Sequence, residues 1–185
     1  CEKLEDYHLF YGIPEKWRTP HSRYNTLPAE ELLSAGYKVL SQLPGGNPDI
    51  FIKKKNSLSI FAQGHLEYDR ETLIYEYRRD LGKYFSGESS LLPNIPEGYF
   101  DTKTAEAVQA WIHASLLAPQ EADFGFINAL FRNATLANGW RPIAVQLFSN
   151  WIALLLQDAA RRRLAKSFRH SRPELSAADM EWRAE

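Results

Sequence analysis

Cysteine is almost absent from this sequence, because Cys1 is the only one among 185 residues. A single thiol cannot form an internal disulfide bond, so we expect a reducing compartment, the cytoplasm. Paired cysteines and His-x-x-x-His spacings are lacking too, and we therefore expect no metal centre. The chain begins Cys-Glu-Lys-Leu without an initiator methionine, and we expect it to be a fragment or a processed product.

Neither sign of charge is in excess, and no long apolar run is present. The 22 basic and 23 acidic residues give a formal net charge of -1. This balance gives no reason to expect nucleic acid or an anionic membrane as a partner. The longest apolar run, residues 151–156, is far shorter than the roughly 18 residues of a membrane helix, so we expect no membrane span.

The composition is that of a globular domain, with 44% hydrophobic and 24% charged residues. Apolar runs between turn residues predict strands at 37–43, 49–53 and 57–63. A 3.6-residue period predicts helices at 28–33, 70–86, 104–117, 122–136 and 141–167. Asp69 is the expected cap of the second helix. The last helix carries an apolar face made of Val145, Phe148, Trp151, Ile152, Leu155 and Leu156.

A histidine and a carboxylate stand two residues apart where the third strand ends and the next helix begins. In an extended segment, positions i and i+2 face the same side, so His65 and Glu67 can serve one site. A carboxylate that orients an imidazole is a common way to build a general base. The alternative is a solvated or structurally bonded histidine. Zinc is a poor alternative, because these two residues supply at most two ligands and His21 a third only by conjecture.

Residues 21–23, His-Ser-Arg, form a second polar cluster. Arginine binds carboxylates with two hydrogen bonds and serine adds a directional one, so the cluster could hold a carboxylate substrate. A loop that satisfies its own backbone is the alternative, and the residues alone favour it. Arg78 and Arg79 lie on the helix after His65, where one of them could point back to the site. A solvent-facing helix surface is the alternative for both.

Six short motifs follow one another along the chain in a characteristic order. They are Pro-His-Ser-Arg-Tyr at 20–24, Gly-His-Leu-Glu-Tyr-Asp at 64–69, Thr-Leu, Glu and Arg-Asp at 72–80, Tyr-Phe at 99–100, Trp-Arg at 140–141 and Leu-Phe-Ser-Asn-Trp at 147–151. In this combination, over about residues 8–101 and 140–157, the chain resembles the homoserine O-succinyltransferase family of the class I glutamine-amidotransferase-like superfamily. The combination is far more specific than any one motif.

The resemblance implies a fold and an activity. The fold is α/β, a partial flavodoxin-like or class I glutamine-amidotransferase-like layer with a helical C-terminal region. The activity is transfer of an acyl group from succinyl-CoA or acetyl-CoA to the hydroxyl of homoserine through a cysteine thioester, in methionine biosynthesis. Acyl-CoA is a co-substrate, no cofactor is implied, and a homodimer is left open.

The resemblance also assigns roles by position. His65 resembles the base and Glu67 its carboxylate partner. Ser22 and Arg79 resemble substrate-binding positions. The resemblance therefore favours Arg79 over Arg78. It also favours substrate binding by residues 21–23 over a loop that satisfies only its own backbone. His21 and Arg23 flank that substrate site.

The same resemblance divides the chain. Residues 1–101 correspond to the C-terminal part of the acyltransferase α/β domain, 102–139 to a helical insert or extension, 140–167 to the closing helix of the same domain and 168–185 to a polar tail. The insert has no functional interpretation.

The departures from the family concern the nucleophile and one turn. The family's cysteine lies on an elbow after a strand, upstream of the loop at 20–24, as does a substrate-binding lysine. Cys1 lacks the preceding strand, so we expect the nucleophile to be missing and the chain alone to be inactive. Leu66 replaces the usual proline, which should loosen the turn between His65 and Glu67.

Several functions remain open at this point. Serine is a close alternative acceptor, because one methylene changes binding by only about 1 kcal/mol or a little more. An amidotransferase-like hydrolase and a non-catalytic remnant of the fold are further alternatives. The choice between a succinyl and an acetyl donor also stays open.

Overall fold

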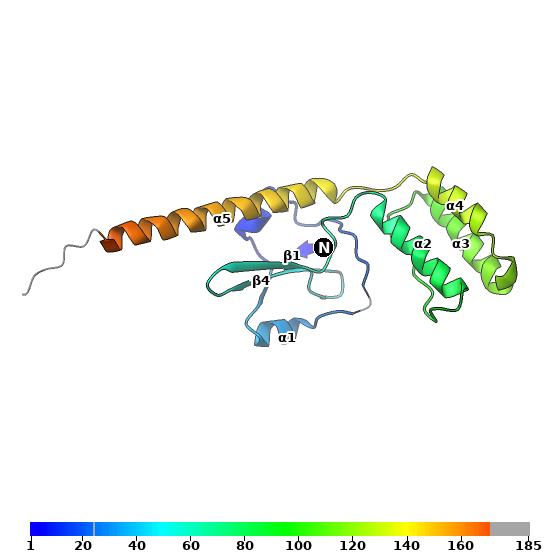
Figure 1. Cartoon of the computed structure of the whole chain (residues 1–185), viewed down its shortest axis with the longest axis horizontal. Helices are drawn as coiled ribbons and strands as arrows, with labels where there is room; N and C mark the ends of the chain where they lie inside the picture. The colour runs from blue at the N-terminus through cyan, green and yellow to red at the C-terminus, as the bar shows by residue number, and fades with distance from the viewer. Residues whose placement is uncertain (24, 171–185) are drawn as a thin grey trace, which may run out of the picture.

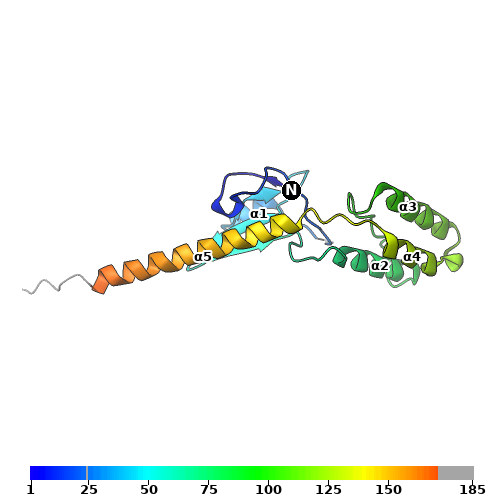
Figure 2. The ribbon, with the colours of Figure 1, turned by 90° about the horizontal axis from the view of Figure 1, so that it is seen from above.

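A computed structural model describes residues 1–23 and 25–170 of the chain. Strands occupy the middle of the molecule, and helices extend from them in opposite directions (Figure 1). The long helix α5, Arg141–His170, runs past the strands to one end. The other end holds α2 (Thr72–Phe85), α3 (Thr102–Leu117) and α4 (Phe124–Asn133) (Figure 2). The predicted α/β class is confirmed.

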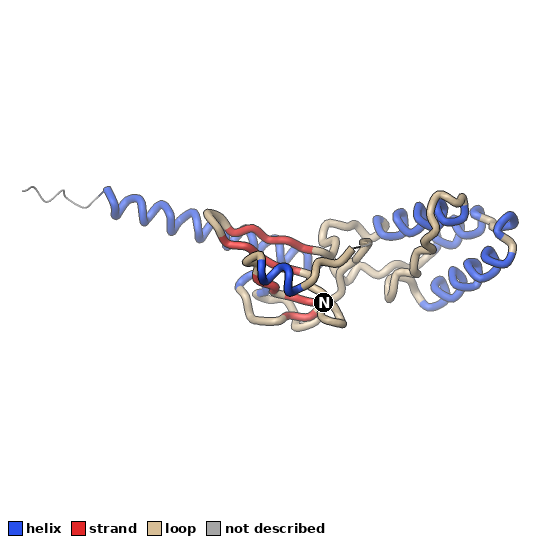
Figure 3. Tube along the Cα trace, turned by 90° about the horizontal axis from the view of Figure 1, so that it is seen from below, coloured by secondary structure: helices blue, strands red, loops and turns tan. Residues whose placement is uncertain are grey.

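The central sheet is antiparallel and is built around one apolar strand. Its order is β2 (Lys38–Val39), β4 (Ile50–Lys54) and β5 (Leu58–Ala62). β4 and β5 form a hairpin (Figure 3). Its register pairs Ile50 with Ala62. Ile50, Phe51 and Ile52 are all buried, which explains why this stretch forms the middle strand.

A second pair of strands, β1 (Glu2–Lys3) and β3 (Ser41–Gln42), is also antiparallel. The single strand predicted at 37–43 is therefore divided. Leu40 is fully buried at the division, where the chain changes its pairing partner from β4 to β1. Backbone hydrogen bonds continue across the division, because the N–H of Leu40 donates to the oxygen of Ile50 at 2.8 Å and the oxygen of Leu40 accepts from the N–H of Leu4 at 2.9 Å.

The core of the strand region is closed by α5 and by the short 3-10 helix η1, His8–Phe10. Leu9 from η1 and Leu147 from α5 are both buried in it. Asn150 fixes the two elements, because its Nδ2 donates hydrogen bonds of 2.8 Å to the backbone oxygens of Leu9 and Tyr11. The Ser-Asn-Trp motif is therefore a helix anchor in this structure.

A separate core holds the helices at the other end. Its buried members include Leu73, Ile74, Tyr77, Leu81, Val108, Trp111, Ile112, Ile127 and Phe131. These side chains recur at helical spacing on α2, α3 and α4. Residues 102–139, predicted as an insert, thus share one core with α2. The short helices α1 (Ala29–Ser34) and η2 (Pro119–Glu121) complete the described helices.

Helix capping differs from the prediction at α2. Asp69 was expected to cap it, but the cap position is Glu71, without a side-chain hydrogen bond. The Asp69 carboxylate instead pairs with Arg141 at 3.4 Å. α3 has the cap that the sequence reasoning missed, since Asp101 accepts a hydrogen bond of 3.0 Å from the backbone N–H of Thr104.

The predicted apolar face of α5 exists, but much of it points to solvent. Val145, Phe148, Ile152, Leu155 and Leu156 are between 38% and 66% exposed. By length and composition, residues 141–165 of this helix could cross a membrane, with a mean hydropathy of 1.3. The sequence prediction of no membrane span rested on uninterrupted apolar runs, and in this helix polar residues interrupt the apolar ones. Soluble proteins use the same pattern wherever a helix packs on another polypeptide.

The helix also extends beyond its predicted end. It continues from 167 to His170, so the first residues of the predicted polar tail belong to α5. The rest of that prediction, residues 171–185, lies outside the described residues. Arg162 holds the helix against the hairpin, because its guanidinium donates a hydrogen bond of 2.5 Å to the backbone oxygen of Asn56.

Candidate active site

The pairing predicted for His65 and Glu67 is present in the structure. His65 Nδ1 lies 2.8 Å from Glu67 Oε1. The backbone does not reach this geometry as an extended strand, because β5 ends at Ala62 and residues 66 and 67 form a turn. An ionised carboxylate only accepts hydrogen bonds, so Nδ1 carries the proton and Nε2 is left with its lone pair. This is the tautomer that a general base needs.

The imidazole is held on its flat side by Tyr68. The two rings are stacked with centroids 4.2 Å apart. Burial raises the pKa of Tyr68 well above its usual range, and the hydrogen bond of its hydroxyl to Glu76 adds to the shift. The hydroxyl therefore stays protonated and donates to Glu76 Oε2 at 2.8 Å. Trp140 Nε1 donates to the backbone oxygen of Tyr68 at 3.0 Å, so the Trp-Arg motif supports the same loop.

The loop at 20–23 lies directly against the loop that carries His65. The backbone N–H of His65 donates to the oxygen of Pro20 at 2.8 Å. Arg23 donates from its guanidinium to Gln63 Oε1 at 2.5 Å. Ser22 is half-buried beside it. The structure thus brings the two predicted polar segments together, while Tyr24 lies outside the described residues.

Arg79 reaches the site through intermediates. Its guanidinium lies 3.6 Å from Glu76 and 2.8 Å from Asp80. Glu76 is also the acceptor of the Tyr68 hydroxyl, which leads to the ring of His65. The predicted substrate-binding arginine is therefore linked to the predicted base by one carboxylate and one tyrosine.

Asp49 is the site residue that the sequence analysis missed. It is only 1% exposed and stands immediately before β4. Its Oδ1 accepts a hydrogen bond of 3.1 Å from the backbone N–H of Gly64, and its Oδ2 accepts one of 3.2 Å from the Ser41 hydroxyl. The same Oδ1 lies 3.5 Å from His21 Nε2. Asp49 thereby joins both site loops to the sheet.

An acid directly before an apolar strand was the only sequence signal for Asp49. Its partners His21 and Gly64 are remote in sequence, and spacing rules do not connect them. Gly64 itself is required by the close approach of these groups. A Cβ atom at this position would lie 2.5 Å from Thr19 Cγ2 and 3.1 Å from Asp49 Oδ1.

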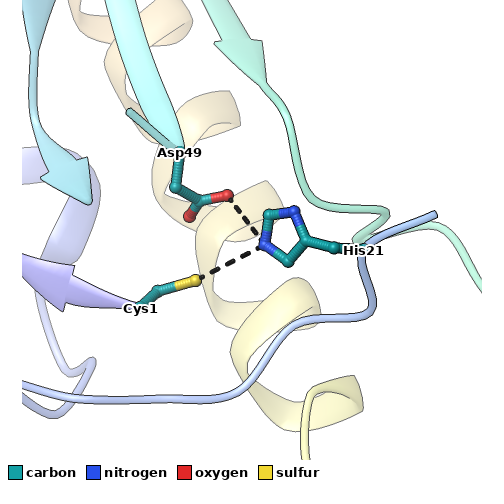
Figure 4. A group of neighbouring side chains, drawn as sticks. All are labelled: Cys1, His21 and Asp49. Carbon is teal, nitrogen blue, oxygen red and sulfur yellow. Dashed lines mark hydrogen bonds and ion pairs between the residues drawn. The ribbon is translucent and has the colours of Figure 1, made fainter. Parts of the chain in front are cut away.

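Cys1 joins the cluster at the same edge of the His21 ring as Asp49 (Figure 4). Its Sγ lies 3.9 Å from His21 Nε2, the same nitrogen that faces Asp49. Burial lowers the pKa of His21, and the charge of Asp49 opposes that shift. In a nucleophile–imidazole–carboxylate relay the two partners bind different ring nitrogens. Cys1, His21 and Asp49 do not have that arrangement.

An apolar groove adjoins the catalytic pair. It has a volume of about 440 Å³ and lies between α5 and the β4–β5 hairpin. Its apolar walls include Leu9, Ile50, Ile60, Leu66, Phe148 and Trp151. Glu67 and Arg141 also line it. The exposed face of α5 and the predicted catalytic carboxylate therefore border the same depression.

Comparison with known proteins places this geometry in a family. A family model for homoserine O-succinyltransferase matches residues 2–161. The homoserine O-succinyltransferase of Methylorubrum extorquens is 32% identical over 86% of this chain and 48% of its own length. That of Rhodopseudomonas palustris is 34% identical over 85% of this chain and 47% of its own length.

A homoserine O-acetyltransferase of Methanomassiliicoccus intestinalis is 41% identical over 80% of this chain and 38% of its own length. The chain thus spans about half or less of the length of the curated relatives it matches. With its family-model match covering most of the chain, the protein belongs to the homoserine O-succinyltransferase family.

Proposed function

We propose that this chain supplies the base and part of the substrate site of a homoserine O-acyltransferase. The observation that carries the proposal is the 2.8 Å contact between His65 Nδ1 and Glu67 Oε1. It leaves Nε2 as the base, and Glu67 stabilises the imidazolium that forms. Relatives with both succinyltransferase and acetyltransferase names support the reaction class and leave the donor to experiment.

The reaction proceeds in two transfers with one base. His65 Nε2 takes the proton of a cysteine thiol as the sulfur attacks the acyl-CoA carbonyl, and it returns that proton to the departing CoA thiolate. It then takes the proton of the homoserine hydroxyl as that oxygen attacks the enzyme thioester. The proton passes to the regenerated cysteine, so each transfer is balanced.

The substrate's carboxylate has cationic candidates on two sides of the base. Arg23 is fixed by Gln63, next to the loop that carries His65. Arg79 is oriented by Glu76 and Asp80. We assign carboxylate binding to Arg79 with Ser22 as a hydrogen-bonding partner, and we assign to His21 and Arg23 the positioning of that loop.

The nucleophilic thiol comes, in this proposal, from a part of the enzyme outside residues 1–185. The geometry of Cys1 supports this, because its sulfur approaches a nitrogen of His21 that also faces Asp49. The length of the relatives supports it too, since about half of their sequence has no counterpart in this chain. That remaining part of the fold also supplies the parallel layer implied by the family resemblance.

The exposed face of α5 and the adjoining groove are where the remaining part of the fold docks. Phe148 lines the groove and is 58% exposed. Each fully buried side chain of this size stabilises an interface by about 1.5–3 kcal/mol. Because Glu67 lies in the same groove, a polypeptide that fills it comes next to the catalytic pair.

An acyl-transfer assay tests the proposal. The purified chain is mixed with the portion of the Methylorubrum extorquens relative that its match to this chain leaves uncovered. Succinyl-CoA and acetyl-CoA are each offered with homoserine and with serine, and O-acyl products are measured by mass spectrometry. We expect a product with homoserine only when both polypeptides are present.

The other outcomes separate the alternatives. Product from the chain alone that disappears in Cys1→Ser makes Cys1 the nucleophile. Preference for serine changes the acceptor, and glutamine hydrolysis in place of acyl transfer indicates an amidotransferase-like hydrolase. A well-formed complex without any of these activities indicates a non-catalytic form of the fold.

A further inference from the structure

Three potential metal ligands from distant parts of the chain converge beside the active-site loops (Figure 4). They are Cys1 Sγ, His21 Nε2 and a carboxylate oxygen of Asp49, and these atoms all lie within 4.8 Å of one another. The sequence analysis expected no metal centre, because these residues show no ligand spacing along the chain. The fold, not the sequence order, assembles the set.

The contact between His21 and Asp49 is long for a hydrogen bond, and the two distances from His21 Nε2 are close to those around a shared ion. His21 Nε2 lies 3.5 Å from Asp49 Oδ1, which is longer than the roughly 2.7–3.2 Å that is usual for an N–H···O hydrogen bond. It lies 3.9 Å from Cys1 Sγ. Tetrahedral zinc with ordinary bond lengths places its ligand atoms about 3.3–3.6 Å apart. Small side-chain rotations toward a common centre therefore suffice.

We propose that Cys1, His21 and Asp49 bind a divalent transition metal ion, with Zn²⁺ the best chemical match. A thiolate and an imidazole favour zinc over magnesium or calcium, which prefer oxygen ligands. One thiolate and one carboxylate also neutralise the two positive charges of the ion. With three protein ligands, the fourth coordination position is taken by water.

The ligands are held in place by their surroundings. Cys1 is fixed through both of its backbone groups, because its nitrogen donates to the oxygen of Trp17 at 2.7 Å and its oxygen accepts from the nitrogen of Trp17 at 3.0 Å. The carboxylate of Asp49 is oriented by Gly64 and Ser41. Such outer contacts reduce the reorganisation that metal binding requires.

An open cavity of about 600 Å³ is lined by Cys1 and gives the solvent a route to this ligand. Its charged lining is balanced, with Glu2 and Glu97 against Lys16 and Arg18. A bound ion joins the chain at Cys1, the loop at 20–23 and the start of β4. It therefore acts as a cross-link next to the loop that carries His65, independently of which reaction that loop serves.

Zinc titration of the purified chain against a chromophoric chelator tests the proposal. We expect one Zn²⁺ per chain, and an affinity at least about 100-fold lower in Cys1→Ser and in His21→Gln. Co²⁺ gives a second readout, because a cobalt–thiolate charge-transfer band should appear in the original chain and be absent in Cys1→Ser. His113→Gln is the matched control, because His113 is exposed on α3 and should not affect binding.

Three results would overturn the site. They are no stoichiometric binding by the original chain, unchanged affinity in His21→Gln, or an equal loss in His113→Gln, which indicates non-specific binding. Circular dichroism confirms that each variant is folded before its affinity is compared. Asp49→Asn adds a third ligand test where it folds, and the other two variants decide the matter where it does not.

Discussion

At the scale of single residues, the site depends on close contacts around Asp49 and Gly64. Asp49 is buried, and its carboxylate meets Gly64, Ser41 and His21. A buried carboxylate needs such partners, since an unpaired one carries a large desolvation penalty. The backbone of Gly64 comes this near only because it has no side chain. The position of His65 therefore depends on its neighbour.

Replacing Gly64 by alanine should destabilise the protein by about 1–3 kcal/mol, because the new methyl group overlaps Thr19 and crowds His21 and Asp49. Urea unfolding followed by circular dichroism measures the change. The matched control is Gly82→Ala within α2, where a Cβ meets nothing within 4 Å. That change should stabilise by about 0.5–1 kcal/mol. If the two substitutions change the unfolding free energy equally, the close contacts at Gly64 do not determine the stability of the protein.

Only part of the contacts made by these residues could be predicted from the sequence. The pairing of His65 with Glu67 was predictable, since two residues of spacing restrict where the side chains can go. The contacts of Asp49 were not, because its partners lie on other segments and only the folded chain brings them together. The roles of His65, Glu67, Ser22 and Arg79 remain predictions from the family resemblance.

At the scale of elements, α5 is fastened to the strand region by Asn150. Its side chain donates two hydrogen bonds to the backbone of residues 9 and 11, and its Oδ1 accepts one of 3.0 Å from Gln146. Asn150→Ala leaves the buried carbonyl of Leu9 and the partly buried carbonyl of Tyr11 without these donors, and we expect a loss of about 1–3 kcal/mol in unfolding free energy.

Chemical denaturation of Asn150→Ala and of the control Asn133→Ala provides the measurement. Asn133 lies on the exposed side of α4, where its side chain bonds only the backbone oxygen of Ala129. The control should change stability by less than about 0.5 kcal/mol. If both variants unfold at the same urea concentration, Asn150 is not the anchor of α5.

The N-terminus of α3 gives the fold an acid-sensitive point. Hydrogen bonds from the Thr104 side chain and backbone lower the pKa of Asp101 below its ordinary value of 3.8. A lowered folded-state pKa means that the stabilisation is complete above pH 3.8 and is lost as the pH falls through the lower, folded-state value. Thermal melts between neutral pH and pH 3 should show this loss in the original chain, and Asp101→Asn should show a smaller one. An identical pH dependence in both proteins would contradict the assignment.

The predicted elements were mostly present, because each has a clear apolar period. The division of the strand at Leu40 and the cap at Asp101 were missed. The cap is a local contact of Asp101 with Thr104, and an aspartate before a helical pattern could have indicated it. The division depends on the pairing of β3 with β1, which lies far away in the sequence. Tertiary contacts of this kind leave no period in the sequence.

At the scale of the whole molecule, the strand region and the helices α2 to α4 have separate cores. Apart from Trp151, which packs on the strand-region core, the apolar face of α5 is covered by neither of them. By length and composition, a membrane is the other environment that could cover this helix. Under the proposed function, the remaining part of the acyltransferase fold covers this face.

Placing a charge on this face separates folding from assembly. Leu156→Asp should leave the stability of the chain within about 0.5 kcal/mol, because Leu156 is 66% exposed. It should weaken binding of the complementary part of the relative by at least about tenfold, since a buried carboxylate must be desolvated. Leu117→Asp on α3, which is 77% exposed, is the control and should not change that binding. Titration calorimetry measures the binding affinity of both variants. If Leu156→Asp and Leu117→Asp weaken binding equally, α5 is not part of the interface.

In the proposed function, His65 is the base of an acyltransferase whose thiol lies outside this chain. The most direct test is the rate of O-acylhomoserine formation by the complemented protein, measured with a chelator present so that metal binding does not contribute. We predict that His65→Asn lowers this rate by about 10²–10⁴-fold, whereas Cys1→Ser retains most of it. Near-normal activity in His65→Asn, or its loss in Cys1→Ser, would contradict the account.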